Sequence, residues 1–197
     1  TVKPLALLQT NNLRLVQWAK AVAPPALWQF AYRRLVVRDI PDAERYGMVY
    51  QPWRDPGFLA QYERCRPRTL VGPEACWQLA SRLRQSLQVP GAVYELGVYK
   101  GGTARLLRDG LEGTGRTLRL FDTFAGMEVT DAAKGDRHRA GDFADTSLEG
   151  VRAFVGAEPW IDYRAGWVPA TFSGIEGDTV ALAHVDLDLH DPIREAC

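Results

Sequence analysis

A glycine-rich turn in the second half of the chain has the composition of a ligand-binding loop. It reads ELGVYKGGT over residues 95–103 and follows an apolar segment. Glycines let a backbone approach a ligand closely, and the amide-rich start of a following helix favours an anionic group. The spacing Gly-x-x-x-Gly-Gly is neither the Gly-x-Gly-x-x-Gly of a dinucleotide fold nor the Gly-Lys-Ser/Thr of a phosphate loop. The turn therefore indicates either another kind of binding loop or a tight turn alone.

Asp122 closes the next apolar segment, 25 residues after Gly97. A carboxylate in this place can accept hydrogen bonds from both hydroxyls of a ribose, as in nucleoside-binding sheets. It can equally serve as a helix N-cap or as a turn residue. Together with the glycine turn, Asp122 favours a ligand that contains adenosine.

A pair of aspartates, Asp186 and Asp188, follows the last apolar segment. The period-two geometry of a strand would place both carboxylates on the same side. Such a pair suits a hard divalent cation such as Mg²⁺, or one metal ligand and one proton acceptor. The alternative is an ordinary strand end, followed by Asp191 as a cap before Pro192. The pairing favours a chemical role.

The elements that must position these residues alternate between strands and helices from residue 91 onward. Strands are expected at 92–96, 117–121, 160–163 and 180–185, and helices at about 103–111 and 147–155. This alternation predicts an α/β fold, with a parallel sheet covered by helices on both faces. Ligands of such sheets bind beyond the carboxyl ends of the strands. The glycine turn, Asp122 and the aspartate pair all fall at that edge.

The first ninety residues have a different pattern, mainly helical and irregular. Short helices are expected at about 13–19, 26–37 and 72–87, with a loop over 41–56. Arg33 and Arg34 lie beside aromatic residues and could suit a membrane surface. Packing of this helix on the domain or on a second subunit is the favoured interpretation.

Composition excludes several classes of protein. Of the 197 residues, 46% are hydrophobic and 24% charged, which is an ordinary globular mixture. Lys+Arg and Asp+Glu both number 24, so net charge gives no support for binding nucleic acid. No apolar run approaches the ~20 residues of a membrane-spanning helix. Charge is nevertheless uneven, with 13 basic and 6 acidic residues in 1–90 against 11 and 18 in 91–197.

The cysteines and histidines form no known reactive motif. Cys65, Cys76 and Cys197 are odd in number and lack CxxC spacing, which argues against a disulfide framework or a zinc site and favours a reducing, cytoplasmic setting. The three histidines, at 138, 184 and 190, have no HExxH or triad context. Without a Gly-x-Ser-x-Gly elbow, a serine hydrolase is disfavoured.

Five segments in matching order resemble the macrocin O-methyltransferase (TylF) family, whose members methylate sugar hydroxyls on macrolides, aminocoumarins and other glycans. They are ELGVYKGGTARLL (95–107), LFDTFAGM (120–127), GDFADTSLEGVRAFV (141–155), AGWVPATF (165–172) and HVDLDLHDP (184–192). The resemblance covers residues 69–197 and implies a Rossmann-like, class I S-adenosylmethionine-binding methyltransferase domain. Residues 1–68 would then form a helical extension that serves as a lid or an oligomer contact.

The resemblance also implies roles for individual residues. The methionine end of the cofactor is assigned to Glu95, Gly97, Gly101 and Thr103, and the ribose to Asp122. Segments near the adenosine contain Ser147, Gly166 and Trp167, and Thr69 also reaches the cofactor. Asp186 matches the first ligand of a Mg²⁺ ion, and Asp188 the general base.

Family members continue beyond the fourth strand with three more strands and an Asp-Asp pair that completes the metal site. The resemblance thus implies that residues 1–197 are a portion of a longer protein whose C-terminal strands are missing here.

The expected function is transfer of a methyl group from S-adenosylmethionine to a hydroxyl of a sugar or glycosylated natural product. The acceptor would be a small molecule and the enzyme a homo-oligomer. Methyl transfer is an in-line displacement that requires alignment of donor and acceptor and loss of the hydroxyl proton. Mg²⁺ chelated by a vicinal diol would lower the hydroxyl pKa, and Asp188 would accept the proton.

Two other functions remain open at this point. A nicotinamide-dependent dehydrogenase shares the sheet and the acidic residue after the second strand, but its Gly-x-Gly-x-x-Gly turn is absent. A catalytically inactive binding protein could also retain a cofactor-binding fold.

Overall fold

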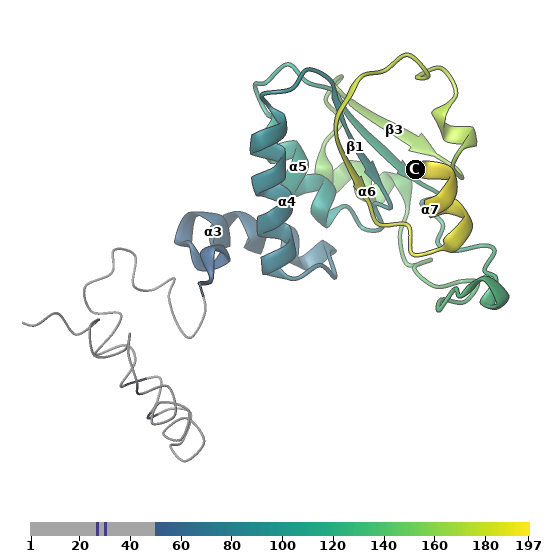
Figure 1. The fold of residues 1–197 in the computed structure, drawn as a ribbon, viewed down its shortest axis with the longest axis horizontal. Helices are drawn as coiled ribbons and strands as arrows, with labels where there is room; N and C mark the ends of the chain where they lie inside the picture. The colour runs from purple at the N-terminus through teal and green to yellow at the C-terminus, as the bar shows by residue number, and fades with distance from the viewer. Residues whose placement is uncertain (1–26, 28–29, 31–49) are drawn as a thin grey trace, which may run out of the picture. The chain divides into compact units, whose positions relative to one another are not determined.

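The computed structural model describes Leu27, Phe30 and residues 50–197 (Figure 1). Contacts divide the chain into two compact units, Thr1–Phe58 and Leu59–Cys197. The helix expected at 13–19 and most of that expected at 26–37 lie outside the described residues, although Leu27 and Phe30 are helical. The domain boundary expected at residue 68 stays a prediction.

Four parallel strands form one sheet in the second unit, in the order β3-β2-β1-β4. Their bounds are Ala92–Leu96 for β1, Leu118–Asp122 for β2, Ile161–Ala165 for β3 and Val180–Val185 for β4. All four lie within two residues of the strands expected from the sequence. The chain order reverses at β1, which pairs with both β2 and β4. Such a switch point is where open α/β sheets bind ligands, outside the carboxyl ends of the strands.

Three helices form a layer on one face of this sheet: α4 (Pro73–Ser86), α5 (Gly102–Leu111) and α6 (Leu148–Val155). α5 contacts both α4 and α6, and α4 also contacts β4. Each helix has a local signal in the sequence. Pro73 and Glu74 occupy the first turn of α4, and the Ser147 hydroxyl caps α6 by accepting the N–H of Gly150 at 3.1 Å.

The opposite face carries an apolar cluster of Tyr94, Leu96, Phe121 and Ile175. Phe172 of the short helix η6 (Ala170–Phe172) and Ala196 of α7 (His190–Ala196) pack against it. Figure 1 shows α7 on the side of the sheet away from α4. The expected α/β fold with helices on both faces is therefore confirmed.

Some elements differ from those expected. Residues 52–56 fall within the expected loop, but Pro52–Arg54 form the short helix η3, and α3 (Pro56–Cys65) begins at Pro56. Further short helices are η4 (Arg66–Arg68) and η5 (Ala132–Lys134). Among the described residues, no helix is long and apolar enough to cross a bilayer.

Candidate active-site cavity

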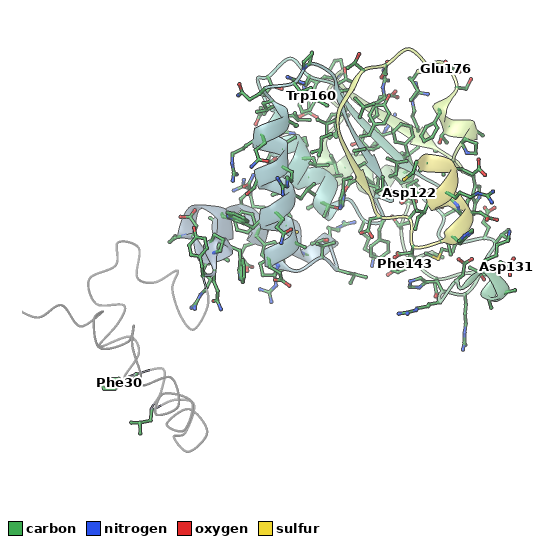
Figure 2. The ribbon with its side chains drawn as sticks, in the orientation of Figure 1. Phe30, Asp122, Asp131, Phe143, Trp160 and Glu176 are labelled. Carbon is green, nitrogen blue, oxygen red and sulfur yellow. The ribbon has the colours of Figure 1, made fainter. Side chains whose placement is uncertain are left out.

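A cavity of about 390 Å³ opens at the carboxyl edge of the sheet, within the ~300–1,000 Å³ usual for small-molecule sites. All four strands contribute to it, through residues 97–99, 122–123, 166–168 and 186–189. Residues 68–71 and the connection from β2 to α6 supply further walls. In Figure 2, Asp131 and Phe143 mark that connection, below Asp122.

Asp122 joins the ends of β1 and β2. Its Oδ2 accepts the backbone N–H groups of Val98 at 2.7 Å and Tyr99 at 2.9 Å, and its Oδ1 accepts that of Phe124 at 2.7 Å. Asp122 therefore both holds the turn, as the sequence suggests, and lines the cavity. The Thr123 hydroxyl also donates to Oδ1, at a long 3.5 Å. A carboxylate has about four lone-pair sites, so a ligand hydroxyl would replace this long contact rather than a backbone bond.

Gly97 lies where β1 and β4 come closest. Its φ is +91°, and a Cβ there would lie only 2.0 Å from the carbonyl oxygen of Asp186. The neighbouring backbone is joined by the N–H of Asp186, which donates to the carbonyl of Leu96 at 2.8 Å. Glycine at this position therefore allows the two strand ends to meet at the cavity.

We expect Gly97→Ala to destabilise the fold and to distort the cavity wall, because the segment after β4 must move away to admit the added methyl group. Gly113→Ala is the matched control, since Gly113 has a φ of +75° but a Cβ added there would meet no atom within 4 Å. That control carries only the cost of a left-handed backbone, about 1–2 kcal/mol. Urea unfolding and calorimetry compare the stability of the two variants. Equal losses of stability would contradict the close approach of Gly97 to the Asp186 carbonyl.

The two aspartates after β4 both line the cavity, but not for the reason that the sequence suggests. β4 ends at Val185, so Asp186 and Asp188 do not alternate along a strand. Asp188 instead has a φ of +59°, and this turn directs the chain back to the cavity. Partial desolvation and the negative charge of Asp186 raise the pKa of Asp188 above its usual range. A raised pKa makes its carboxylate a better proton acceptor.

A complete metal site does not form among the residues that the structure describes. Asp186 and Asp188 reach the cavity, but no group of three or more potential ligands gathers in residues 50–197. Mg²⁺ is commonly bound by one or two carboxylates together with oxygens of substrate and water, so Asp186 and Asp188 are the described residues that would hold it. The ligand role of Asp186 stays a prediction.

Glu95 lies beneath the cavity rather than in its wall. It is fully buried, with Oε1 3.2 Å from Nδ1 of His184 and Oε2 without a hydrogen-bond partner. Burial raises its pKa, although the contact with His184 opposes this. The two residues are register partners on β1 and β4, so His184 is a partly buried, hydrogen-bonded histidine. Glu95 is not among the residues that line the cavity, and its contact with the cofactor stays a prediction.

The remaining expected site residues divide into two groups. Thr69, Thr103, Gly166 and Trp167 line the cavity; Gly101 and Ser147 do not. Gly101 lies at the start of α5 in a left-handed conformation, where a Cβ would be 2.8 Å from Val155.

Five further cavity residues are not among the predicted site residues, although Tyr99, Met127 and Phe143 lie within the segments that resemble the family: Arg68, Tyr99, Met127, His138 and Phe143. Three of them belong to the connection between β2 and α6. Its length could have indicated them, because loops longer than about 12–15 residues are often lids or binding loops.

Comparisons with known proteins agree with this architecture. Residues 67–197 match the family model described as macrocin-O-methyltransferase (TylF). A curated relative from Streptomyces olivaceus, 8-demethyl-8-(2,3-dimethoxy-alpha-L-rhamnosyl)-tetracenomycin-C 4'-O-methyltransferase, is 29% identical over 177 residues, covering 82% of this chain and 67% of its own length.

Two solved structures share the fold. The O-methyltransferase NovP aligns with a TM-score of 0.53 and 23% identity, over 64% of this chain and 58% of its own. CalS11, a calicheamicin methyltransferase, aligns with a TM-score of 0.51 and 21% identity, over 71% of each chain. This chain thus spans less than two thirds of the NovP chain.

Proposed function

We propose a methyltransferase function for this chain, which belongs to the macrocin O-methyltransferase (TylF) family. In this proposal it transfers the methyl group of S-adenosylmethionine to a hydroxyl of a sugar or glycosylated small molecule. The observation that carries the proposal is the cavity shared by all four strand ends, with Asp122 and Asp188 in its wall. The name of the Streptomyces relative, which acts on a rhamnosyl group, supports a sugar as acceptor.

The nucleoside would lie across the ends of β1, β2 and β3. Asp122 would accept a hydrogen bond from a ribose hydroxyl in place of the long contact from Thr123, while its contacts with the amides of Val98 and Tyr99 hold the carboxylate in place. The indole of Trp167 offers an apolar surface for the adenine, and its Nε1 donates to Glu128 at 3.4 Å. Thr103, in the first turn of α5, would face the methionine end of the cofactor, where helix amides favour its carboxylate.

Bound S-adenosylmethionine supplies an electrophilic methyl group. The protein must then hold the acceptor hydroxyl in line with that group and accept its proton. In our proposal the Asp188 carboxylate takes this proton as the new oxygen–carbon bond forms and the sulfur–methyl bond breaks, which leaves S-adenosylhomocysteine as the second product. The raised pKa of Asp188 favours this role. The described donors do not complete a Mg²⁺ site, so no step is assigned to a metal. Mg²⁺ dependence, a homo-oligomeric state and a cytoplasmic location stay predictions.

Cofactor binding separates this proposal from the two alternatives. We expect saturating S-adenosylhomocysteine to raise the unfolding temperature by about 5 °C or more, and NAD to leave it unchanged. Transfer of a labelled methyl group from S-adenosylmethionine to methyl α-L-rhamnopyranoside then tests activity. Stabilisation by NAD alone would favour a dehydrogenase. Binding of S-adenosylhomocysteine without transfer to any glycoside would favour an inactive binding protein.

A further inference from the structure

His138 is a cavity residue that the proposed function has not used. It lies on the connection between β2 and α6 and lines the cavity together with Asp188. The two side chains reach the cavity from different walls, the loop and the end of β4. An acceptor held against Asp188 would therefore also meet His138.

Asp142 determines which nitrogen of the His138 ring carries a hydrogen. Nδ1 of His138 lies 3.3 Å from Oδ2 of Asp142, and the same oxygen accepts the N–H of Arg139 at 2.9 Å. The bond from Arg139, followed by that of His138, lowers the pKa of Asp142, so its carboxylate is ionised and can only accept. When the ring carries a single hydrogen, Asp142 therefore places it on Nδ1, and Nε2 then has a lone pair.

Aromatic packing holds the His138 ring in place. Its centroid lies 5.1 Å from that of Phe143, which in turn lies 5.2 Å from that of Tyr99 in an edge-to-face arrangement. Tyr99 belongs to the turn after β1, and its hydroxyl donates to Asp145 at 2.7 Å. The ring is thus connected to the wall of the cavity that the proposed cofactor would occupy.

Backbone and ionic contacts also hold the loop that carries His138. The N–H of Met127 donates to the carbonyl of Asp142 at 2.9 Å, and the N–H of Gly141 donates to the carbonyl of Met127 at 2.7 Å. Lys134 forms an ion pair with Asp191 of α7 at 2.5 Å. These contacts close the base of the loop and join its tip to the segment after β4, beside the proposed acceptor position.

We propose that Nε2 of His138 accepts a hydrogen bond from a second hydroxyl of the acceptor, next to the hydroxyl that is methylated, and that Asp142 is the positioning residue for this ring. The inference rests on the proposed function, because it takes Asp188 to face the reacting hydroxyl. Two hydrogen-bond acceptors on two walls select a sugar with two free neighbouring hydroxyls. A site built to bind a hydroxyl discriminates strongly against an analogue that lacks it.

The test combines variants of the protein with analogues of the acceptor. Wild type, His138→Ala and His138→Gln are assayed on methyl α-L-rhamnopyranoside and its three monodeoxy analogues. We expect wild-type kcat/KM to fall roughly tenfold to a hundredfold on the analogue that lacks the neighbouring hydroxyl. His138→Ala should show the same loss on the parent glycoside and no further loss on that analogue.

The other variants separate hydrogen bonding from packing. Gln keeps an acceptor atom near the place of Nε2, so His138→Gln should recover part of the activity with the parent glycoside. The kcat/KM of Asp142→Asn on the parent glycoside should lie between those of wild type and His138→Ala. The asparagine amide of this variant can donate to Nδ1 and so move the ring hydrogen to Nε2. Arg137→Ala is the control on the same loop, because Arg137 is exposed and does not line the cavity. Its kcat/KM on all four glycosides should equal that of wild type.

The outcomes distinguish this inference from the proposed function. Binding of S-adenosylhomocysteine should be the same in wild type and in every His138 variant. Equal losses for His138→Ala on all four glycosides, or a His138→Gln variant no better than His138→Ala, would overturn the inference while leaving the methyltransferase proposal intact. A wild-type protein that methylates none of the glycosides also overturns it. Failure of the wild-type protein to bind S-adenosylhomocysteine overturns the proposed function itself.

Discussion

Replacing Asp122 with alanine is expected to lower the affinity for S-adenosylhomocysteine at least about a hundredfold. Two losses combine in this variant. The ribose loses a charged hydrogen-bond acceptor, and each such bond contributes about 1.5–3 kcal/mol. The amides of Val98, Tyr99 and Phe124 also lose their acceptor, so the turn that forms the cavity wall is no longer held. Isothermal titration calorimetry measures the change in dissociation constant.

Two further variants show whether the loss of affinity for S-adenosylhomocysteine is specific to the Asp122 carboxylate. Asp122→Asn keeps the size of the side chain and one acceptor oxygen, so it should bind with intermediate affinity. Asp131→Ala is the matched control, because Asp131 makes a similar turn by accepting the N–H of Ala133 at 2.9 Å and does not line the cavity. It should bind as wild type does. An Asp122→Ala protein that is folded and binds with unchanged affinity would refute the ribose role.

Asp188→Asn should reduce turnover by about 10²–10⁴-fold, the usual contribution of a positioned acid or base. Asparagine cannot accept the hydroxyl proton, but it has nearly the same shape. It also tolerates the left-handed backbone of this position, where φ is +59°. The fold and the affinity for S-adenosylhomocysteine should therefore be retained. Single-turnover measurement of methyl transfer reports the chemical step directly.

The control for this variant is Asp131→Asn, which removes an exposed carboxylate outside the cavity and should leave the rate unchanged. A loss of affinity in Asp188→Asn that matches its loss of rate would indicate a binding role in place of proton transfer. Unchanged turnover would remove Asp188 from the mechanism altogether.

Local patterns in the sequence determined the sheet and its edge. The apolar runs of β1, β2 and β4 and the capping signals of α4 and α6 are short-range features, because each depends on residues within a few positions of one another. The predicted elements include no helix over 57–65, although Phe58, Tyr62 and Cys65 have helical spacing, because the prolines of the preceding segment indicate a loop up to residue 56.

Residue types and strand order together also determined much of the candidate site. Asp122, Gly97, Asp186 and Asp188 all line the cavity, because the carboxyl ends of parallel strands meet at one edge. Family resemblance added Thr69 and Trp167, which also line the cavity. Glu95 lies near the end of an expected strand, but its side chain is buried beside His184 and does not line the cavity. Its contact with the cofactor stays a prediction.

Only the tertiary structure decided which distant side chains meet. Residues far apart in sequence come together in the contacts of Asp122 with the turn after β1, in the cavity lined by both His138 and Asp188, and in the pairing of Lys134 with Asp191. No local periodicity encodes such contacts, because they depend on how strands are ordered and how a long loop folds back. The sequence by itself thus determined the strands and the residue types at their ends, whereas the fold decided which of those residues share the cavity.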